Sequence, residues 1–157
     1  MNLVLETVVP SAENGKKIAK FLSENFWTEH SLSGEQSPEI DWSRASAHIN
    51  HFMFEGIVYN VSDGDKIIGS IAVAPDKHWW SAEEYVGDGW FFVLPEYRNL
   101  KDQTSPSHLL IDAVIDYANK LEKPLIMGVF NIHGVERAKK LFNKKGFHQI
   151  GGMYYRN

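Results

Sequence analysis

Residues 90–98 read Trp-Phe-Phe-Val-Leu-Pro-Glu-Tyr-Arg, an apolar run that is stopped by a proline. Such a run predicts a buried strand, here over residues 85–94. A polar loop follows at residues 99–104. Ser105-Pro106 then predicts a helix start, because serine is a favoured N-cap and proline suits the first helical position. A strand that leads through a short loop into a helix N-terminus can hold a phosphate group, so residues 90–108 predict an anion site.

The rest of the second half has equally clear element signals. Pro124 is expected to end the helix that starts at Ser105. A short apolar strand is predicted over residues 125–130, and an amphipathic helix over about 133–145. Gly146 suits the left-handed position after the last helical turn, with Phe147 folding back towards Phe142. Residues 149–156 are expected to form the last strand.

The first half is predicted to supply the remaining strands and helices. The strands are expected at residues 3–9, 56–61 and 66–74, and the helices at residues 11–25 and 43–54. Ser62-Asp63-Gly64-Asp65 predicts a tight hairpin turn, and Gly69 predicts a bulge or a close backbone approach. The element order is βααβββαβαβ. No repeat or linker interrupts it, so we predict one α/β domain over residues 1–157.

The composition is that of an ordinary globular protein. The chain has 157 residues, of which 43% are hydrophobic and 23% charged, and a net charge of -4. The negative charge argues against a broad nucleic-acid or anionic-membrane surface. The absence of cysteine excludes disulfides, thiolate metal sites and a cysteine nucleophile. With no signal-peptide pattern and no run near the ~20 apolar residues that cross a bilayer, we expect a cytoplasmic protein.

The element order and parts of the second half resemble the GNAT (Gcn5-related N-acetyltransferase) superfamily. Three sequence segments carry the resemblance. They are Phe92-Val93-Leu94-Pro95-Glu96-Tyr97-Arg98, the Leu109-Leu110 helix, and Ala138…Leu141-Phe142…Lys145-Gly146-Phe147. The last piece is similar to the family's Ala-x-x-Leu-Tyr-x-Lys-x-Gly-Phe ending. The resemblance implies a mixed central sheet with splayed fourth and fifth strands. It also implies acetyl-coenzyme A as donor, an amine as acceptor, and a homodimer as one expected state.

The resemblance places the donor in the gap between the splayed strands. Its pantetheine arm is expected to hydrogen-bond the backbone of Phe92, Val93 and Leu94, and Asn131 after the fifth strand. Its diphosphate is expected on the loop and helix start, with Arg98 or Lys101 as the cation. The other residues expected beside the donor are Thr104, Ser105, Ser107, His108 and Phe142.

Two positions depart from the family's pattern. The diphosphate loop usually carries two glycines, but Thr104 and Pro106 stand there, and proline also lacks an N–H. The tyrosine that often protonates the leaving thiolate is replaced by Phe142. Water, Tyr154 or Tyr155 remains for that role. These departures favour an alternative function, a non-catalytic binding or regulatory module on the same fold.

The resemblance also implies a general base that takes a proton from the amine. In the family this is sometimes a glutamate on the fourth strand, about five residues before a bulge. The matching position is Asp88, and Glu84 is the alternative. Asp88 lies in Gly87-Asp88-Gly89, where a turn residue is an equally good interpretation. Without cysteine there is no thioester-linked intermediate, so direct attack in a ternary complex is expected.

Aromatic and acidic residues of the first half favour a cationic acceptor. The aromatic candidates for the acceptor pocket are Trp27, Trp42, Trp79 and Trp80, because rings attract alkylammonium groups. The acids are Glu29, Glu35, Glu39, Asp41, Glu83 and Glu84, for which a solvated acidic surface is the alternative. His48 and His51 share a helix face, but His-x-x-His alone predicts exposed polar residues, so no metal is expected.

Overall fold

The computed structural model describes residues 1–29, 39–100, 104–129, 134–154 and 156. Its strands are β1 Leu3–Thr7, β2 Ile57–Asp63, β3 Lys66–Lys77, β4 Glu84–Val93 and β5 Leu125–Ile126. Its α-helices are α1 Ala12–Phe21, α2 Trp27–Glu29, α3 Trp42–Glu55, α4 Pro106–Lys120 and α5 Val135–Lys144. A π-helical turn, Leu22–Phe26, joins α1 to α2, and a 3-10 turn, Pro95–Tyr97, follows β4.

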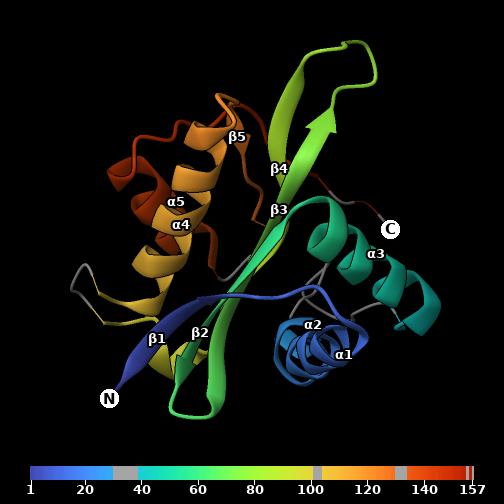
Figure 1. Ribbon diagram of the computed structural model, residues 1–157. Coiled ribbons are helices and arrows are strands. Elements are labelled where there is room, and N and C mark those ends of the chain that lie inside the picture. The colour runs from blue at the N-terminus through green and yellow to red at the C-terminus, as the bar shows by residue number, and fades with distance from the viewer. Residues whose placement is uncertain (30–38, 101–103, 130–133, 155, 157) are drawn as a thin grey trace.

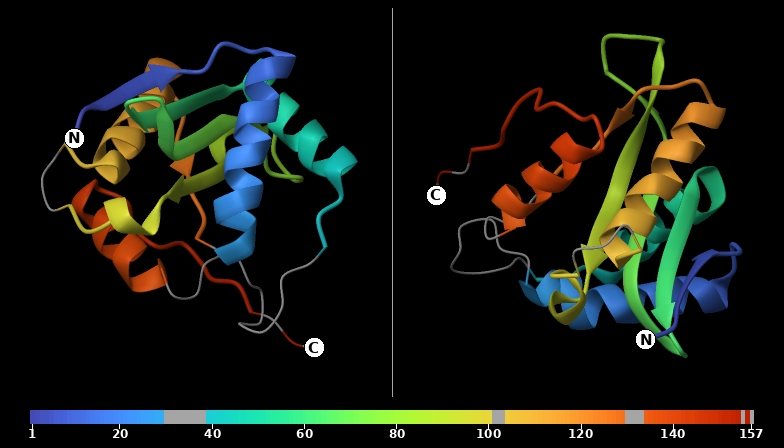
Figure 2. Two further views of the ribbon diagram at one scale, coloured as in Figure 1. Left: turned by 90° about the horizontal axis from the view of Figure 1, so that it is seen from below. Right: turned by 90° about the vertical axis from the view of Figure 1, so that its left-hand side faces the viewer.

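The sheet has the strand order β1-β2-β3-β4-β5. Neighbouring strands from β1 to β4 are antiparallel, and β5 is parallel to β4. The helices cover both faces: α1 and α3 lie on one side of the sheet, while α4 and α5 lie on the other (Figures 1 and 2). The predicted mixed α/β sheet is confirmed.

Helix and turn signals in the sequence act as predicted. The hydroxyl of Ser11 accepts the amide of Asn14 at 3.0 Å and caps α1. Ser105 is the N-cap of α4, with Pro106 in its first turn. At the end of α5, Gly146 has a φ of 88°. The amide of Phe147 donates to the Phe142 carbonyl at 3.0 Å, which is the predicted Schellman closure.

Bulges distort the sheet at two places. Between β2 and β3 the register shifts beside Gly69, where an added Cβ would lie 3.1 Å from the Leu110 side chain of α4. The predicted close approach at Gly69 is therefore confirmed. Between β3 and β4, Ala72 pairs with Trp90 but Val73 pairs with Asp88, so Gly89 is the bulged residue. The resemblance implied a bulge on this strand about five residues after Asp88, so the observed position differs from the prediction.

Two predicted strands of the C-terminal part differ from the structure. The strand expected over residues 125–130 ends at Ile126, and the described residues of 149–156 form no strand. Ile150 is 72% exposed. The Gln149 side chain donates to the Gly151 carbonyl at 2.9 Å, a local bond in place of a ladder bond. Gly151-Gly152 weakens strand formation because glycine loses much conformational entropy and offers no side chain to pack.

Candidate active site

The neighbouring strands β4 and β5 pair over a short distance and then part. The pairs are Val86 with Leu125 and Gly87 with Ile126, and the Val86 amide donates to the Pro124 carbonyl at 2.8 Å. β4 continues to Val93 beyond this point, whereas β5 ends. The two strands therefore form a fork that opens after Gly87, as the predicted splay requires.

Asp88 lies at the opening of this fork. Both of its carboxylate oxygens accept the amide of Gly128, each at 3.3 Å, so the side chain links β4 to the segment after β5. The carboxylate is partly buried. Burial raises its pKa above the ordinary value, opposed by the Gly128 amide and by nearby His48. A carboxylate with a raised pKa is better suited to accept a proton from an amine.

The bulge at Gly89 determines where Asp88 sits. It directly follows Asp88, whereas the resemblance implied a bulge farther along the strand. Counting five residues back from Gly89 gives Glu84 instead. Glu84 begins β4 and forms a half-exposed ion pair with Lys123 at 3.8 Å. Of the two acids, Asp88 is the one at the fork.

Helix α3 lies over the bulge from one face of the sheet. A ring nitrogen of His48 lies 3.3 Å from the Gly89 carbonyl. The His48 ring also packs against Phe52, with centroids 4.8 Å apart. An added Cβ on Gly89 would lie 2.7 Å from the Phe52 ring. Glycine is thus required here for the close approach of α3. Because Gly89 has no side chain, α3 comes close enough to bring His48 next to Asp88.

A cavity of about 150 Å³ opens beside the fork on the α3 face. Its walls are His51 and Phe52 of α3, residues 74–76 of β3, part of β4, and Ile126 of β5. From β4 it is lined by Tyr85, Gly87 and Asp88. The cavity therefore brings two carboxylates, Asp76 and Asp88, together with aromatic rings.

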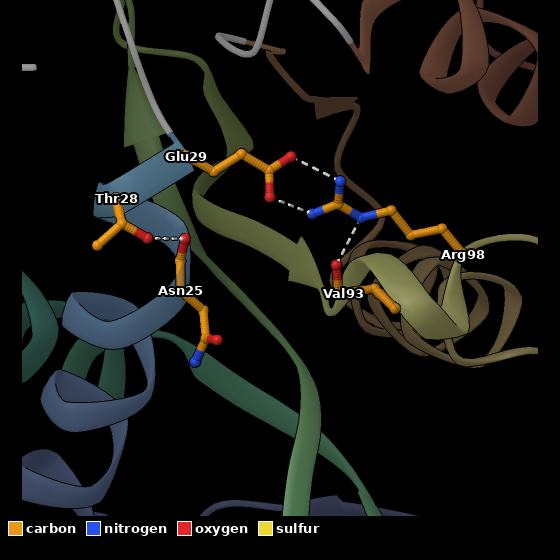
Figure 3. A network of polar contacts seen from close by, with 5 residues as sticks. All are labelled: Asn25, Thr28, Glu29, Val93 and Arg98. Atoms are coloured by element: carbon orange, nitrogen blue, oxygen red, sulfur yellow. Dashed lines mark hydrogen bonds and ion pairs between the residues drawn. The ribbon is translucent and has the colours of Figure 1, made fainter. Parts of the chain in front are cut away.

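Arg98 ties the end of β4 to the helices on the α1 face. Its Nε donates to the Val93 carbonyl at 2.6 Å, and its two terminal nitrogens donate to the Glu29 carboxylate at 2.6 and 2.9 Å (Figure 3). Its guanidinium also lies over the Phe92 ring, 4.8 Å from the centroid. Arg98 is thus engaged with Glu29 and Val93, and the sequence predicted neither interaction.

The other residues expected beside the donor lie along α4 and α5. Ser105 is buried at the start of α4, and Ser107 and His108 lie in its first turn, which Thr104 precedes. Leu94 donates its amide to the Ile68 carbonyl at 2.9 Å. Phe142 of α5 packs against Phe91 and Phe147, at centroid distances of 6.5 and 5.2 Å. Lys101, Asn131 and Tyr155 lie outside the described residues.

Several other candidates do not line the cavity. Tyr154 is fully exposed, and Trp79 is 92% exposed. None of the four tryptophans expected in the acceptor pocket lines the cavity described above; Trp27 packs edge-on against Trp42 instead. In the described part of the chain no group of His, Asp or Glu side chains is arranged to hold a metal ion.

Sequence reasoning missed Asp76, Tyr85 and His51 as cavity residues. Asp76 and Tyr85 are partners in the β3–β4 register, and His51 comes from α3. The alternation of the two strands could have suggested the first pair. The position of α3 over the bulge depends on packing at Gly89, for which one sequence contains no direct signal.

Comparison with known proteins finds likenesses among solved structures only. No family model and no curated protein matches the chain. A predicted acetyltransferase from Clostridium acetobutylicum with acetyl-CoA has a TM-score of 0.71 and 10% identity, with 99% of this chain and 96% of that chain covered. An aminoglycoside acetyltransferase from an uncultured soil metagenomic sample, in complex with trehalose, has a TM-score of 0.68 and 12% identity. The match covers 99% of this chain and 96% of that chain.

A third likeness is to the ribosomal-protein-alanine N-acetyltransferase from Brucella melitensis biovar Abortus 2308. Its TM-score is 0.67 at 11% identity, with 100% of this chain and 98% of that chain covered. All three are named acetyltransferases, and the two whose names state an acceptor differ in it. No helix in the described residues has the length and apolarity to cross a bilayer. The chain has the fold of the GNAT acetyltransferases.

Proposed function

We propose that this protein is an N-acetyltransferase that moves an acetyl group from acetyl-coenzyme A to a primary amine. The observation that carries the proposal is the carboxylate of Asp88 at the opening of the β4–β5 fork, held by the Gly128 amide. A fork between strands exposes backbone groups that a donor can bond. A partly buried carboxylate beside it supplies a base where the amine must lose a proton.

In the proposed reaction the neutral amine nitrogen attacks the acetyl carbonyl carbon. A C–N bond forms, the C–S bond of the thioester breaks, and coenzyme A leaves as its thiolate. Asp88 accepts the proton that the nitrogen loses. The chain contains no cysteine and so cannot form a thioester-linked intermediate, which supports direct transfer of the acetyl group within a ternary complex.

The donor side of the proposal rests on the end of β4 and the start of α4. The Val93 carbonyl accepts Arg98 Nε but retains a second lone pair for a pantetheine amide. The first-turn amides of a helix have no intrahelical partner, and the positive end of its dipole attracts phosphate. We therefore expect Ser107, in the first turn of α4, to contact a diphosphate, together with Thr104.

The leaving thiolate receives no proton from Phe142, which packs its ring on Phe147. A thiol with a pKa of about 8.5 leaves without strong acid assistance.

Binding without catalysis is the second candidate function. It is favoured by Phe142 and by the absence of glycine from residues 99–108.

Turnover with a panel of amines separates the two functions. Because the chain has no cysteine, a thiol reagent reports only released coenzyme A. We expect thiol release that depends on both acetyl-coenzyme A and an amine, matched by a mass increase of the amine. Asp88→Asn should lower kcat/KM by about a hundredfold or more, the usual range for a general base. Thiol release that is absent for every amine, or unchanged in Asp88→Asn, would contradict the proposal.

A further inference from the structure

We infer that the acceptor is a short aliphatic diamine, with one nitrogen at Asp88 and the second, protonated nitrogen at the Asp76 carboxylate. This inference rests on the proposed function and names the substrate class for the same site. It assigns to Asp76 and Tyr85 a role in specificity, separate from the proton transfer proposed for Asp88. It follows from the positions of the two carboxylates on β3 and β4, the aromatic wall beside them and the size of the cavity.

The spacing of the carboxylates follows from the strand register. Asp88 pairs with Val73, and Tyr85 pairs with Asp76. Asp76 thus lies three residues beyond Val73 on β3, so the backbone positions of the two aspartates are about 10 Å apart along the strands at the usual rise. Hydrogen bonds of about 3 Å at both ends leave room between them for a short extended chain. Both carboxylates line the same cavity, and burial together with the charges of Asp76 and Asp88 raises the pKa of Tyr85.

Asp76 is oriented for a cation at the rim of the cavity. Its Oδ1 accepts the Lys77 amide at 2.7 Å, and its Oδ2 accepts the Tyr85 hydroxyl at 3.4 Å. An ionised carboxylate has about four lone-pair sites, so further sites remain for an ammonium group. Within the described residues, no lysine or arginine lines the cavity or pairs with Asp76 or Asp88.

The wall beside the carboxylates is aromatic and held in place. The ring of Tyr85 stacks on His78 with centroids 4.6 Å apart, and His78 stacks on Trp80 at 4.5 Å. This stack belongs to the β3–β4 hairpin, which extends beyond the rest of the sheet (Figure 1). An aromatic face favours the methylene groups next to an ammonium and attracts the cation itself.

The size of the cavity admits a small amine. A cavity of about 150 Å³ can hold a molecule of about the size of benzene. A short diamine has a comparable number of non-hydrogen atoms. Because the two carboxylates of Asp76 and Asp88 line this cavity, it favours an amine with charge at both ends.

Putrescine and butylamine form a matched pair of probes, because they share a four-carbon chain and differ in the second amine. We would measure kcat/KM for both with wild type, Asp76→Asn and Asp65→Asn. The amide introduced by Asp76→Asn keeps the shape of the side chain and can still accept the Lys77 amide. Asp65→Asn removes the same charge far from the cavity, in the hairpin at the other end of β3. Titration calorimetry with each amine alone measures binding without the donor.

We expect wild type to prefer putrescine over butylamine by about tenfold or more, as a charged hydrogen bond provides. Asp76→Asn should remove most of that preference by lowering kcat/KM for putrescine far more than for butylamine, whereas Asp65→Asn should keep it. Tyr85→Phe should weaken the preference in the same direction. Equal use of both amines by wild type, or an equal loss of both in Asp76→Asn, would overturn the inference and leave acetyl transfer standing.

Titration calorimetry with each amine alone separates the inference about the diamine from the proposed acetyl transfer. If no amine is acetylated but putrescine binds with the same dependence on Asp76, the inference stands and the proposed function fails. If putrescine is neither bound nor acetylated while other amines are acetylated, the inference fails and the proposed function stands.

Discussion

The fold places the Asp88 carboxylate where its negative charge is destabilising but where it can accept a proton from an amine. The strand fork exposes it to the Gly128 amide on one side and to the cavity on the other. Burial raises its pKa, and the Gly128 amide and His48 only partly offset that effect. A raised pKa means that the folded protein holds the proton more tightly than the unfolded chain does. Asp88 in its charged form therefore destabilises the fold.

Asp88→Asn should consequently raise the melting temperature while it removes activity. The asparagine Oδ1 can still accept the Gly128 amide, and no charge is left to bury. The gain should be complete at pH values above the pKa of Asp88 in the folded protein. It should fade as the pH falls from there towards the ordinary aspartate pKa of about 3.9, because Asp88 is then protonated in wild type as well.

Thermal denaturation of the two proteins across pH measures this effect. Asp65→Asn is the control, because it removes an exposed carboxylate at the β2–β3 turn. A lower melting temperature for Asp88→Asn at neutral pH would show that its hydrogen bond matters more than its buried charge.

Glu29→Gln should destabilise the fold through Arg98. The two side chains are only 29% and 18% exposed, and the substitution replaces one charged acceptor with an amide while Arg98 stays charged. We expect a loss of about 1–2 kcal/mol in the free energy of unfolding, the usual range for hydrogen bonds to charged groups. Urea denaturation measures it.

The matched control is Glu13→Gln, which breaks the highly exposed pair of Glu13 and Lys17 on α1. Such surface pairs contribute little, so this variant should denature like wild type. Equal denaturation of Glu29→Gln and Glu13→Gln would mean that the bidentate pair of Arg98 adds nothing to stability.

The bulge in β4 is the structural feature that assembles the site. It lets α3 approach the strand, sets His48 against the Gly89 carbonyl and gives the cavity its Phe52 wall. In the sequence, this bulge has only the signal of two glycines around Asp88. By contrast, Ser11, Ser105, Pro106 and Gly146 act through local backbone chemistry, so the helix ends they predict agree with the structure.

Gly89→Ala should test the role of this close approach. The new methyl group would lie 2.7 Å from the Phe52 ring, so the ring or α3 must move. We expect a loss of about 1–3 kcal/mol in stability, typical of overpacking, and weaker binding of amines in the cavity. Denaturation and amine titration measure both effects.

Gly151→Ala is a suitable control, because no heavy atom lies within 4 Å of its added Cβ. It should leave stability and amine binding unchanged. A stable Gly89→Ala variant with normal amine binding would show that α3 can shift without cost, and that the bulge does not shape the site.

The architecture of the whole chain was largely predictable from the sequence, and the site was only partly so. The order of strands and helices up to α5 follows from apolar periodicity and end signals, which act locally. The C-terminal strand was wrong because Gly151-Gly152 disfavours a strand and the Gln149 side chain bonds locally to the Gly151 carbonyl. The Arg98–Glu29 pair joins residues 69 positions apart, and the cavity combines α3, β3, β4 and β5. Neither follows from spacing within one segment.

The central claim is that the β4–β5 fork and the start of α4 bind acetyl-coenzyme A despite a loop without glycine. Titration calorimetry of wild-type protein with acetyl-coenzyme A, accompanied by a thermal shift, tests it most directly. We predict saturable binding at one site, displaced by free coenzyme A, with a rise in melting temperature. The absence of both heat and thermal shift at millimolar acetyl-coenzyme A would contradict the claim.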